Sequence, residues 1–178
     1  NSYGVPSAGP VPPQHWALSP TSPRLAFDRE LARRLAARHL QFTCLVPPDT
    51  TYERLALHVK QQLARVSVEM NVQEASQEQI VQAIRGGNFD AALGDVISGP
   101  SMFRLYQRWH TGGTFNLKAA TNSQVIDAAL DQIRHARGDD DYRTGVGRLQ
   151  QAFVDEPPAI FLAWSERARA VSRAGCSG

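Results

Sequence analysis

Apolar and polar positions alternate in two short stretches of the chain and predict two strands with a helix between them. Stretches 42–46 and 68–73 each place an apolar side chain at every second position, which indicates half-buried strands. Between them, apolar residues follow helical spacing from Tyr52 to Val66, and Thr50–Glu53 has the form of a capping box. A strand, a helix and a second strand in this order predict a crossover with parallel strands.

The pattern then continues toward a third strand. A second capping box at Ser76–Gln79 begins a helix, and Gly86-Gly87 ends it. Alternation begins again at Phe89 and predicts a strand that runs to about Ile97.

The C-terminal half is predicted to be mostly helical. A short helix is expected over 102–109, and helical spacing recurs over 125–133 and 142–153. Gly145 and Gly147 weaken the last of these helices by roughly 1 kcal/mol each relative to Ala. The apolar run Ala159–Trp164 predicts a central strand covered on both faces, and 168–171 predicts a further short strand.

These elements predict an α/β fold, with a mixed, mainly parallel sheet flanked by helices. Residues 1–24 hold more than half of the prolines and are expected to form an extended arm or linker, in which Trp16 and Leu18 pack on the rest. Asp28 is expected to cap a short helix that runs to Arg38. Residues 25–173 are expected to form one α/β domain, and 174–178 a flexible tail.

Composition excludes several partners. The formal charge of the 178 residues is +2, which leaves no excess of basic groups for nucleic acid or for an anionic membrane. No apolar run reaches the ~20 residues of a transmembrane helix. Cys44 lies in an apolar run and is expected to be a buried thiol, although a bridge to Cys176 stays open. Neither an initiating Met nor a signal peptide is visible, so we expect a piece of a longer protein.

The sequence lacks the usual catalytic signatures: phosphate loop, dinucleotide fingerprint, zinc motif and nucleophile elbow. Asp139–Asp141 is interpreted as the acidic first turn of a helix rather than a cation site. A hydrolytic set of His110, Asp95 and a nearby serine has no support in its spacing. We therefore expect no metal, no cofactor and no enzymatic activity.

The order of several stretches between residues 24 and 173 resembles family 5 of the extracellular solute-binding proteins, the dipeptide and oligopeptide binders of ABC importers. A helix, a turn and an alternating strand come first, then a glycine–aromatic–aspartate strand, a Gly-rich loop and two helices. The stretches that carry the resemblance are Ala56–Met70, Gly87–Leu93, Trp109–Asn116, Asp127–Ala136 and Gln150–Leu162.

The resemblance implies one lobe, the second, of a two-lobed protein with the periplasmic-binding-protein type II-like fold. It also implies that a peptide or another small polar solute binds between this lobe and a missing first lobe, and that an ABC permease is the partner. The implied location is periplasmic or extracellular, with membrane anchoring in the full-length protein. Two other functions stay open: a ligand-sensing domain of a regulator and, third, a hydrolytic enzyme.

The resemblance also indicates where this chain departs from peptide binders. The loop Gly94–Pro100 has Ser98-Gly99 where the family places an aspartate, and Pro47–Asp49 stands where dipeptide binders place an arginine. The ligand therefore stays open. The expected rim of the binding cleft consists of Asp95, Ser98, Trp109 and Asn116, although Trp109 also fits a core position and Ser98 and Asn116 also fit turns.

Overall fold

A three-stranded parallel sheet organises the first half of the chain in the computed structural model, which describes residues 4–23, 26–36, 40–96, 101–116 and 122–165. Its strands are β2 (Gln41–Val46), β3 (Glu69–Glu74) and β4 (Ala91–Ala92), in the order β3-β2-β4. Both pairings with β2 are parallel, with Cys44 opposite Val72 and Ala91. The expected parallel sheet is confirmed, but β4 is much shorter than expected.

Helix α2 (Thr50–Ala64) covers one face of this sheet and completes a small core. Cys44, Val46, Ala56 and Met70 are its buried members, and burial raises the pKa of the Cys44 thiol, as expected for a buried cysteine. The predicted capping box at Thr50–Glu53 is wrong by one residue. Asp49 is the N-cap, and its side chain accepts a hydrogen bond from the Thr51 amide at 2.8 Å, because a carboxylate is a strong acceptor for free helix amides.

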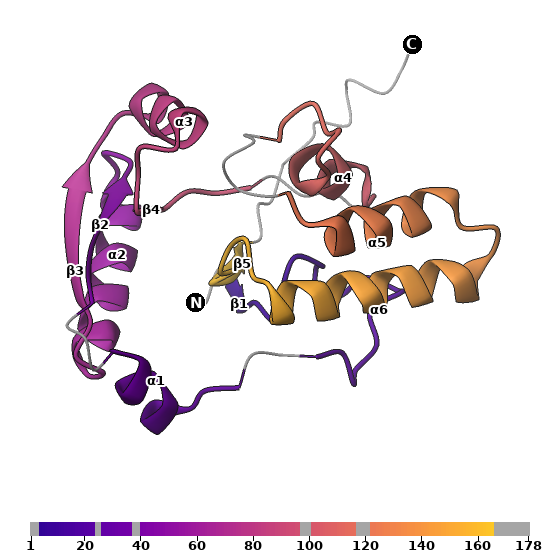
Figure 1. The fold of residues 1–178 in the computed structure, drawn as a ribbon, viewed down its shortest axis with the longest axis horizontal. Helices are drawn as coiled ribbons and strands as arrows, with labels where there is room; N and C mark the ends of the chain where they lie inside the picture. Colours follow the sequence, from indigo (N-terminus) through magenta and orange to yellow (C-terminus); the bar gives the residue numbers. More distant parts are fainter. Residues whose placement is uncertain (1–3, 24–25, 37–39, 97–100, 117–121, 166–178) are drawn as a thin grey trace, which may run out of the picture.

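The other two helices beside the sheet begin as expected. In α3 (Gln77–Gly86), Ser76 and Gln79 form the reciprocal capping box, and Gly87 ends the helix at φ 68°, a left-handed conformation that glycine adopts without strain. In α1 (Arg29–Leu35), Asp28 accepts from the Leu31 amide at 2.8 Å. We call α1, β2, α2, β3, α3 and β4 the sheet unit; it forms the left part of Figure 1.

The second half is built on α4 (Phe103–Trp109), α5 (Gln124–His135) and α6 (Asp139–Asp155). The predicted helices are thus confirmed. Their apolar faces meet in a second core whose buried members include Leu105, Ile126, Leu130 and Leu149. Gly145 lets α5 and α6 approach closely, because a Cβ there would lie 2.9 Å from Cγ1 of Ile133.

The proline-rich N-terminal segment belongs to this second core. Val11 and Ala17 are buried in it and Leu18 packs against it. The side chain of Gln150 donates to the Ala8 carbonyl at 3.1 Å. Leu18 packs on the rest as expected, whereas Trp16 is 53% exposed and stacks on Tyr142 at the surface, with ring centroids 5.1 Å apart. We call α4, α5, α6, residues 4–18 and the strand β5 (Ala163–Ser165) the helical unit (Figure 1).

The prediction of a central strand over the apolar run 159–164 is wrong, because the observed strand β5 is short and lies in a different sheet. It covers only Ala163–Ser165 and pairs antiparallel with β1 (Gly4–Pro6) in a two-stranded sheet. Ile160 is 74% exposed, so the run is not a central strand covered on both faces. Residues 168–171 and Cys176 lie outside the described residues.

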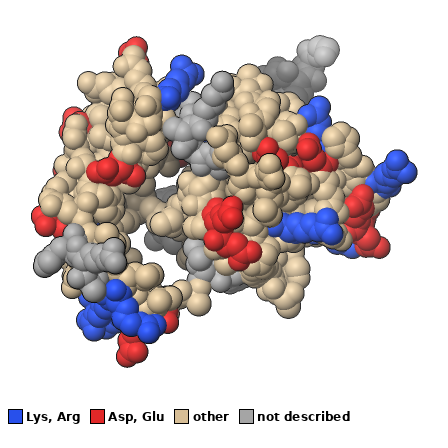
Figure 2. Space-filling view, in the orientation of Figure 1, with Lys and Arg blue, Asp and Glu red and all other residues tan. Residues whose placement is uncertain are grey.

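The two units hold separate hydrophobic cores. Residues between Ser19 and Asp28 and between Leu93 and Met102 connect them, and the space-filling view shows an opening between the two units (Figure 2). Among the described helices, none combines the length and the apolar character needed to cross a membrane.

Candidate functional site

The carboxyl edge of the parallel sheet is the candidate binding surface. Because β2, β3 and β4 run in the same direction, the segments that follow them, 47–49, 75–76 and 93–96, emerge at the same edge. In open α/β sheets this edge is the usual place for a ligand, because loops and helix N-termini there offer side chains and free amides around a crevice. The edge contains a hollow of about 490 Å³ between the end of β2, the end of β3 and the first turns of α2.

Helix α2 positions the polar groups of this hollow. Its lining residues include Pro47, Pro48, Asp49, Glu53 and Glu74. The two prolines end β2, since neither can donate a ladder hydrogen bond, and Asp49 then begins α2. The hydrogen bonds from Thr51 hold the pKa of the Asp49 carboxyl below its ordinary value, so this side chain carries its charge at neutral pH.

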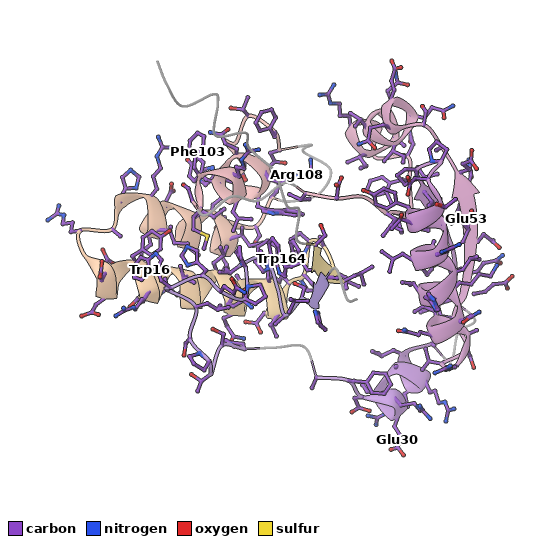
Figure 3. The ribbon with its side chains drawn as sticks, turned by 180° about the vertical axis from the view of Figure 1, so that it is seen from behind. Trp16, Glu30, Glu53, Phe103, Arg108 and Trp164 are labelled. Carbon is purple, nitrogen blue, oxygen red and sulfur yellow. The ribbon has the colours of Figure 1, made fainter. Side chains whose placement is uncertain are left out.

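Acidic side chains dominate this edge. Asp49, Glu53 and Glu74 line the hollow, and no Lys or Arg is among its described lining residues. Glu53 lies in the first turn of α2, in the upper part of the sheet unit in Figure 3, whereas Glu30 of α1 lies at the lower end of that unit. The electrostatic potential here favours a positively charged group of a ligand.

A second hollow, of about 420 Å³, lies between the sheet and α3. Its lining includes Thr43, Gln73, Asn88 and Asp90. The Asp90 carboxylate accepts the Thr43 amide at 2.9 Å, directly before β4 pairs with β2. Asp90 therefore continues the edge of the β2–β4 ladder.

Asp95 and Ser98 are the two sequence-predicted rim residues that follow β4. Asp95 is exposed in the segment after that strand, on the same edge as the acidic hollow. Ser98 lies outside the described residues. Direct contact of Asp95 with a ligand stays a prediction.

Trp109 and Asn116 lie in the helical unit. Trp109 is 3% exposed and packs edge-on against Phe153 and Phe161, with ring centroids 5.5 and 6.0 Å apart. This is the core position that the sequence left open as the alternative to the rim. Asn116 donates from its side chain to the His110 carbonyl at 2.8 Å, and its amide donates to Gly113, which places it in a turn.

His110 has structural partners rather than a hydrolytic set. Its Nδ1 accepts the Gly112 amide at 2.9 Å, and its Nε2 lies 3.4 Å from a carboxylate oxygen of Asp131. The ring also stacks on Tyr106, with centroids 4.2 Å apart. In the part of the chain that the structure describes, no three His, Cys, Asp or Glu side chains are grouped as a metal site.

The sequence did not single out Glu53 and Glu74 as site residues. Glu53 was interpreted as part of a cap, and Glu74 was not singled out. The signal that could have identified them is the parallel sheet itself, because its carboxyl edge gathers the residues that follow each strand.

Comparison with known proteins gives a uniform result for the fold. No family model and no curated protein sequence matches the chain. Among solved structures, it is similar to NikZ from Campylobacter jejuni in complex with Ni(L-His), with a TM-score of 0.78 and 16% identity over 92% of this chain and 37% of that one.

Two further structures show the same likeness. One is the ABC transporter-associated periplasmic binding protein DppA from Helicobacter pylori in complex with the peptide STSA: TM-score 0.76, 14% identity, 92% of this chain and 34% of that chain. The other is a dipeptide binding protein from a Pseudoalteromonas species in complex with Met-Leu. The TM-score is 0.76, with 17% identity over 92% of this chain and 35% of that chain. The chain thus spans about a third of the length of these proteins. Its fold is that of one lobe of a periplasmic binding protein.

Proposed function

We propose that this chain is the second lobe of a family 5 solute-binding protein, the substrate-capturing component of an ABC importer. The observation that supports this most is the agreement in fold with substrate-binding proteins over 92% of the chain, at about a third of their length. One lobe of such a protein supplies one wall of a cleft and performs no chemistry on its ligand.

The rest of the proposal follows from that architecture. A first lobe of the same protein would form the opposite wall, and an ABC permease would receive the ligand from the closed cleft. The protein would act in the periplasm or outside the cell, anchored to the membrane in its full-length form. The ligand would be a peptide or another small polar solute.

The acidic carboxyl edge supports a proposal for the ligand's charge. Asp49, Glu53 and Glu74 surround the hollow at the end of β2, and Asp95 is exposed after β4. Carboxylates in a partly closed cleft attract a cationic group more strongly than they would in open solvent, because the effective dielectric constant is lower there. We propose that a positively charged group of the solute, such as an amine, faces this edge.

The test is to purify the complete product of the gene without denaturation and to identify the molecules that it retains by mass spectrometry. A retained peptide or small polar solute is the expected result. Recovery of no small molecule, combined with no binding to a library of peptides and metabolites, would contradict the proposed function.

Two charge-removing variants then test the acidic edge against the retained solute. Glu74→Gln and Asp95→Asn are each expected to weaken binding several-fold. Glu30→Gln is the matched control, because Glu30 is an exposed acid at the lower end of the same unit, away from Glu53 (Figure 3). Equal weakening by all three variants would point to overall charge and contradict a local role.

A further inference from the structure

Gln150 of α6 is a buried polar side chain beside the apolar core of the helical unit. It is 1% exposed, and among the described residues it is the only polar or charged one that is buried. Its neighbour Leu149 and, one turn away on either side, Val146 and Phe153 are buried members of that core. A leucine at this position would avoid the cost of desolvating an amide, so packing alone does not account for the glutamine.

The N-terminal arm contacts the amide of Gln150 directly. Nε2 donates to the Ala8 carbonyl at 3.1 Å, and a Cβ on Gly9 would lie 2.5 Å from Nε2 and 2.7 Å from Oε1. The backbone of Gly9 therefore approaches the amide as closely as only a residue without a side chain can. Oε1 is buried and accepts no hydrogen bond from the described residues. The hydrogen bond that the amide does make thus goes to the arm.

This contact lies next to the two-stranded sheet of β1 and β5, which Figure 1 shows beside the C-terminal end of α6. Directly after β1, the Ser7 amide donates to the Leu162 carbonyl at 3.2 Å, and the Ser7 hydroxyl donates to the Gly9 carbonyl at 2.9 Å. Pro10 and Val11, which follow the contact, are buried. Hydrogen bonds and close packing therefore connect α6 to the arm, and the arm to β5.

The sheet of β1 and β5 has little stability of its own. Each strand contributes three paired residues, and all three residues of β1 are exposed. A two-stranded sheet is marginal in water unless a further element packs against it. The position of β1 therefore depends on where residues 7–11 are held on α6, and Gln150 supplies a hydrogen bond close to the strand. A buried polar group fixes one arrangement at a cost in stability in coiled coils as well.

We propose that Gln150 is a positioning residue that fixes the connection between this lobe and the rest of the protein, a role that rests on the proposed function. In a two-lobed protein, the chain would pass to the first lobe beyond β1 on one side and beyond β5 on the other. Lobes close around a ligand through changes at a few connecting residues. A connection that is held in one place loses less conformational freedom on closure, which favours binding.

Hydrogen exchange of the 178-residue chain, followed by NMR, tests the contact without any ligand. Gln150→Met keeps the length of the side chain and removes both polar groups of the amide. The Ser7 amide is expected to exchange about fivefold faster in this variant, while the amides of α5 and α6 keep their protection. Gln151→Met is the matched control, because Gln151 is the next residue of α6 and is exposed; it should leave the exchange of Ser7 unchanged.

Three results would each overturn the proposal: a Ser7 amide without protection in the wild-type chain, equal Ser7 exchange in wild type and Gln150→Met, or faster exchange of Ser7 and α6 together. The last result would show that Gln150 stabilises the helical unit as a whole. Gly9→Ala changes the same contact from the side of the arm. Its added Cβ is expected to displace the arm from α6 and to accelerate Ser7 exchange, and an unchanged rate would contradict the close approach.

The effect on the connection is measured in the complete gene product with the solute that it retains. Gln150 lines neither hollow of the sheet unit, so a change in affinity would act through the position of the strands. Isothermal calorimetry is expected to show several-fold weaker binding by Gln150→Met and unchanged binding by Gln151→Met.

Equal affinity of wild type and Gln150→Met, despite faster Ser7 exchange, would overturn the role in the connection and leave the proposed function intact. Recovery of no solute would contradict the proposed function instead. The exchange of Ser7 alone would then decide whether Gln150 fixes the position of the β1–β5 sheet.

Discussion

Ser76 shows how single polar atoms fix the start of α3. Its hydroxyl accepts the Gln79 amide at 3.2 Å, and the Gln79 side chain accepts the Ser76 amide at 2.8 Å. We predict that Ser76→Ala destabilises the chain by about 1 kcal/mol, because one free helix amide loses its partner. Urea unfolding measures this. Ser76→Asp keeps an acceptor at the same place and should retain most of the stability; an equal loss in both variants would contradict the capping role.

Asp141 makes the stability of the fold depend on pH in the acidic range. Its carboxylate accepts the Gln132 side chain at 2.9 Å and the Arg137 amide at 3.3 Å, and these hydrogen bonds lower its pKa from the ordinary value of 3.8. A pKa that is lower in the folded state means that the unfolded state binds the proton more readily. The stability from this group is therefore present above pH 3.8 and is lost as pH falls through the lower folded pKa.

We predict that the melting temperature of the wild-type chain falls more steeply below about pH 4 than that of Asp141→Asn. Circular dichroism melts between pH 7 and pH 2 measure the difference, with the asparagine variant as the chain that cannot titrate at this position. Gln132→Leu removes the largest cause of the shift and should give a slope between the two. Parallel curves for all three proteins would show that Asp141 contributes nothing to the acid sensitivity.

At the scale of secondary-structure elements, the close contact between α5 and α6 depends on Gly145 and not on Gly147. A Cβ at Gly145 would lie 2.9 Å from Cγ1 and 3.1 Å from the amide nitrogen of Ile133, whereas a Cβ at Gly147 would have no neighbour within 4 Å. We predict that Gly145→Ala destabilises the chain by about 1–3 kcal/mol through overpacking, although alanine favours helix. Gly147→Ala should stabilise it by up to about 1 kcal/mol. The same sign for both variants in urea unfolding would contradict this packing.

Elements with strong local signals were predictable from the sequence. The helices α2, α3, α5 and α6 carry long apolar periodicity or caps, and the strands β2 and β3 carry clear alternation. The apolar run at 159–164 shows the limit of such patterns. Its strand pairs with Gly4–Pro6 at the far end of the chain, and periodicity contains no information on such a distant partner.

The candidate site was predictable only in part. Asp95 could be placed because it follows a strand, and Trp109 was correctly given a core alternative. The acidic hollow arises from segments that are distant in sequence and adjacent only because β2 and β3 are parallel neighbours.

At the scale of the whole molecule, the described residues form two separate hydrophobic cores. Leu149 is buried in the helical unit, and Met70 in the sheet unit, in separate clusters of buried residues. We predict that Leu149→Ala destabilises the helical unit by about 2–5 kcal/mol and leaves the sheet unit folded under conditions where the helical unit opens. Hydrogen exchange measures this: the amides of α5 and α6 should lose protection while those of β2 and β3 keep theirs. A uniform loss of protection would show a single cooperative unit.

Ligand affinity is the property that depends most on what surrounds this chain. This chain covers only about a third of the solved structures with the same fold, and a small solute is held tightly only when most of its surface is buried between two walls. The carboxyl edge would supply one wall. Contacts from one side would also leave the charged groups of the ligand largely solvated, where ion pairs contribute little.

We therefore predict that the 178-residue chain binds the solute retained by the complete gene product at least about tenfold more weakly than that product does. Isothermal calorimetry on both proteins with the same solute measures the ratio. Adding back the remainder of the gene product as a separate polypeptide should recover part of the difference if it folds and docks on this lobe. Micromolar binding by the chain alone would show that a single wall suffices, and would place the whole site within these residues.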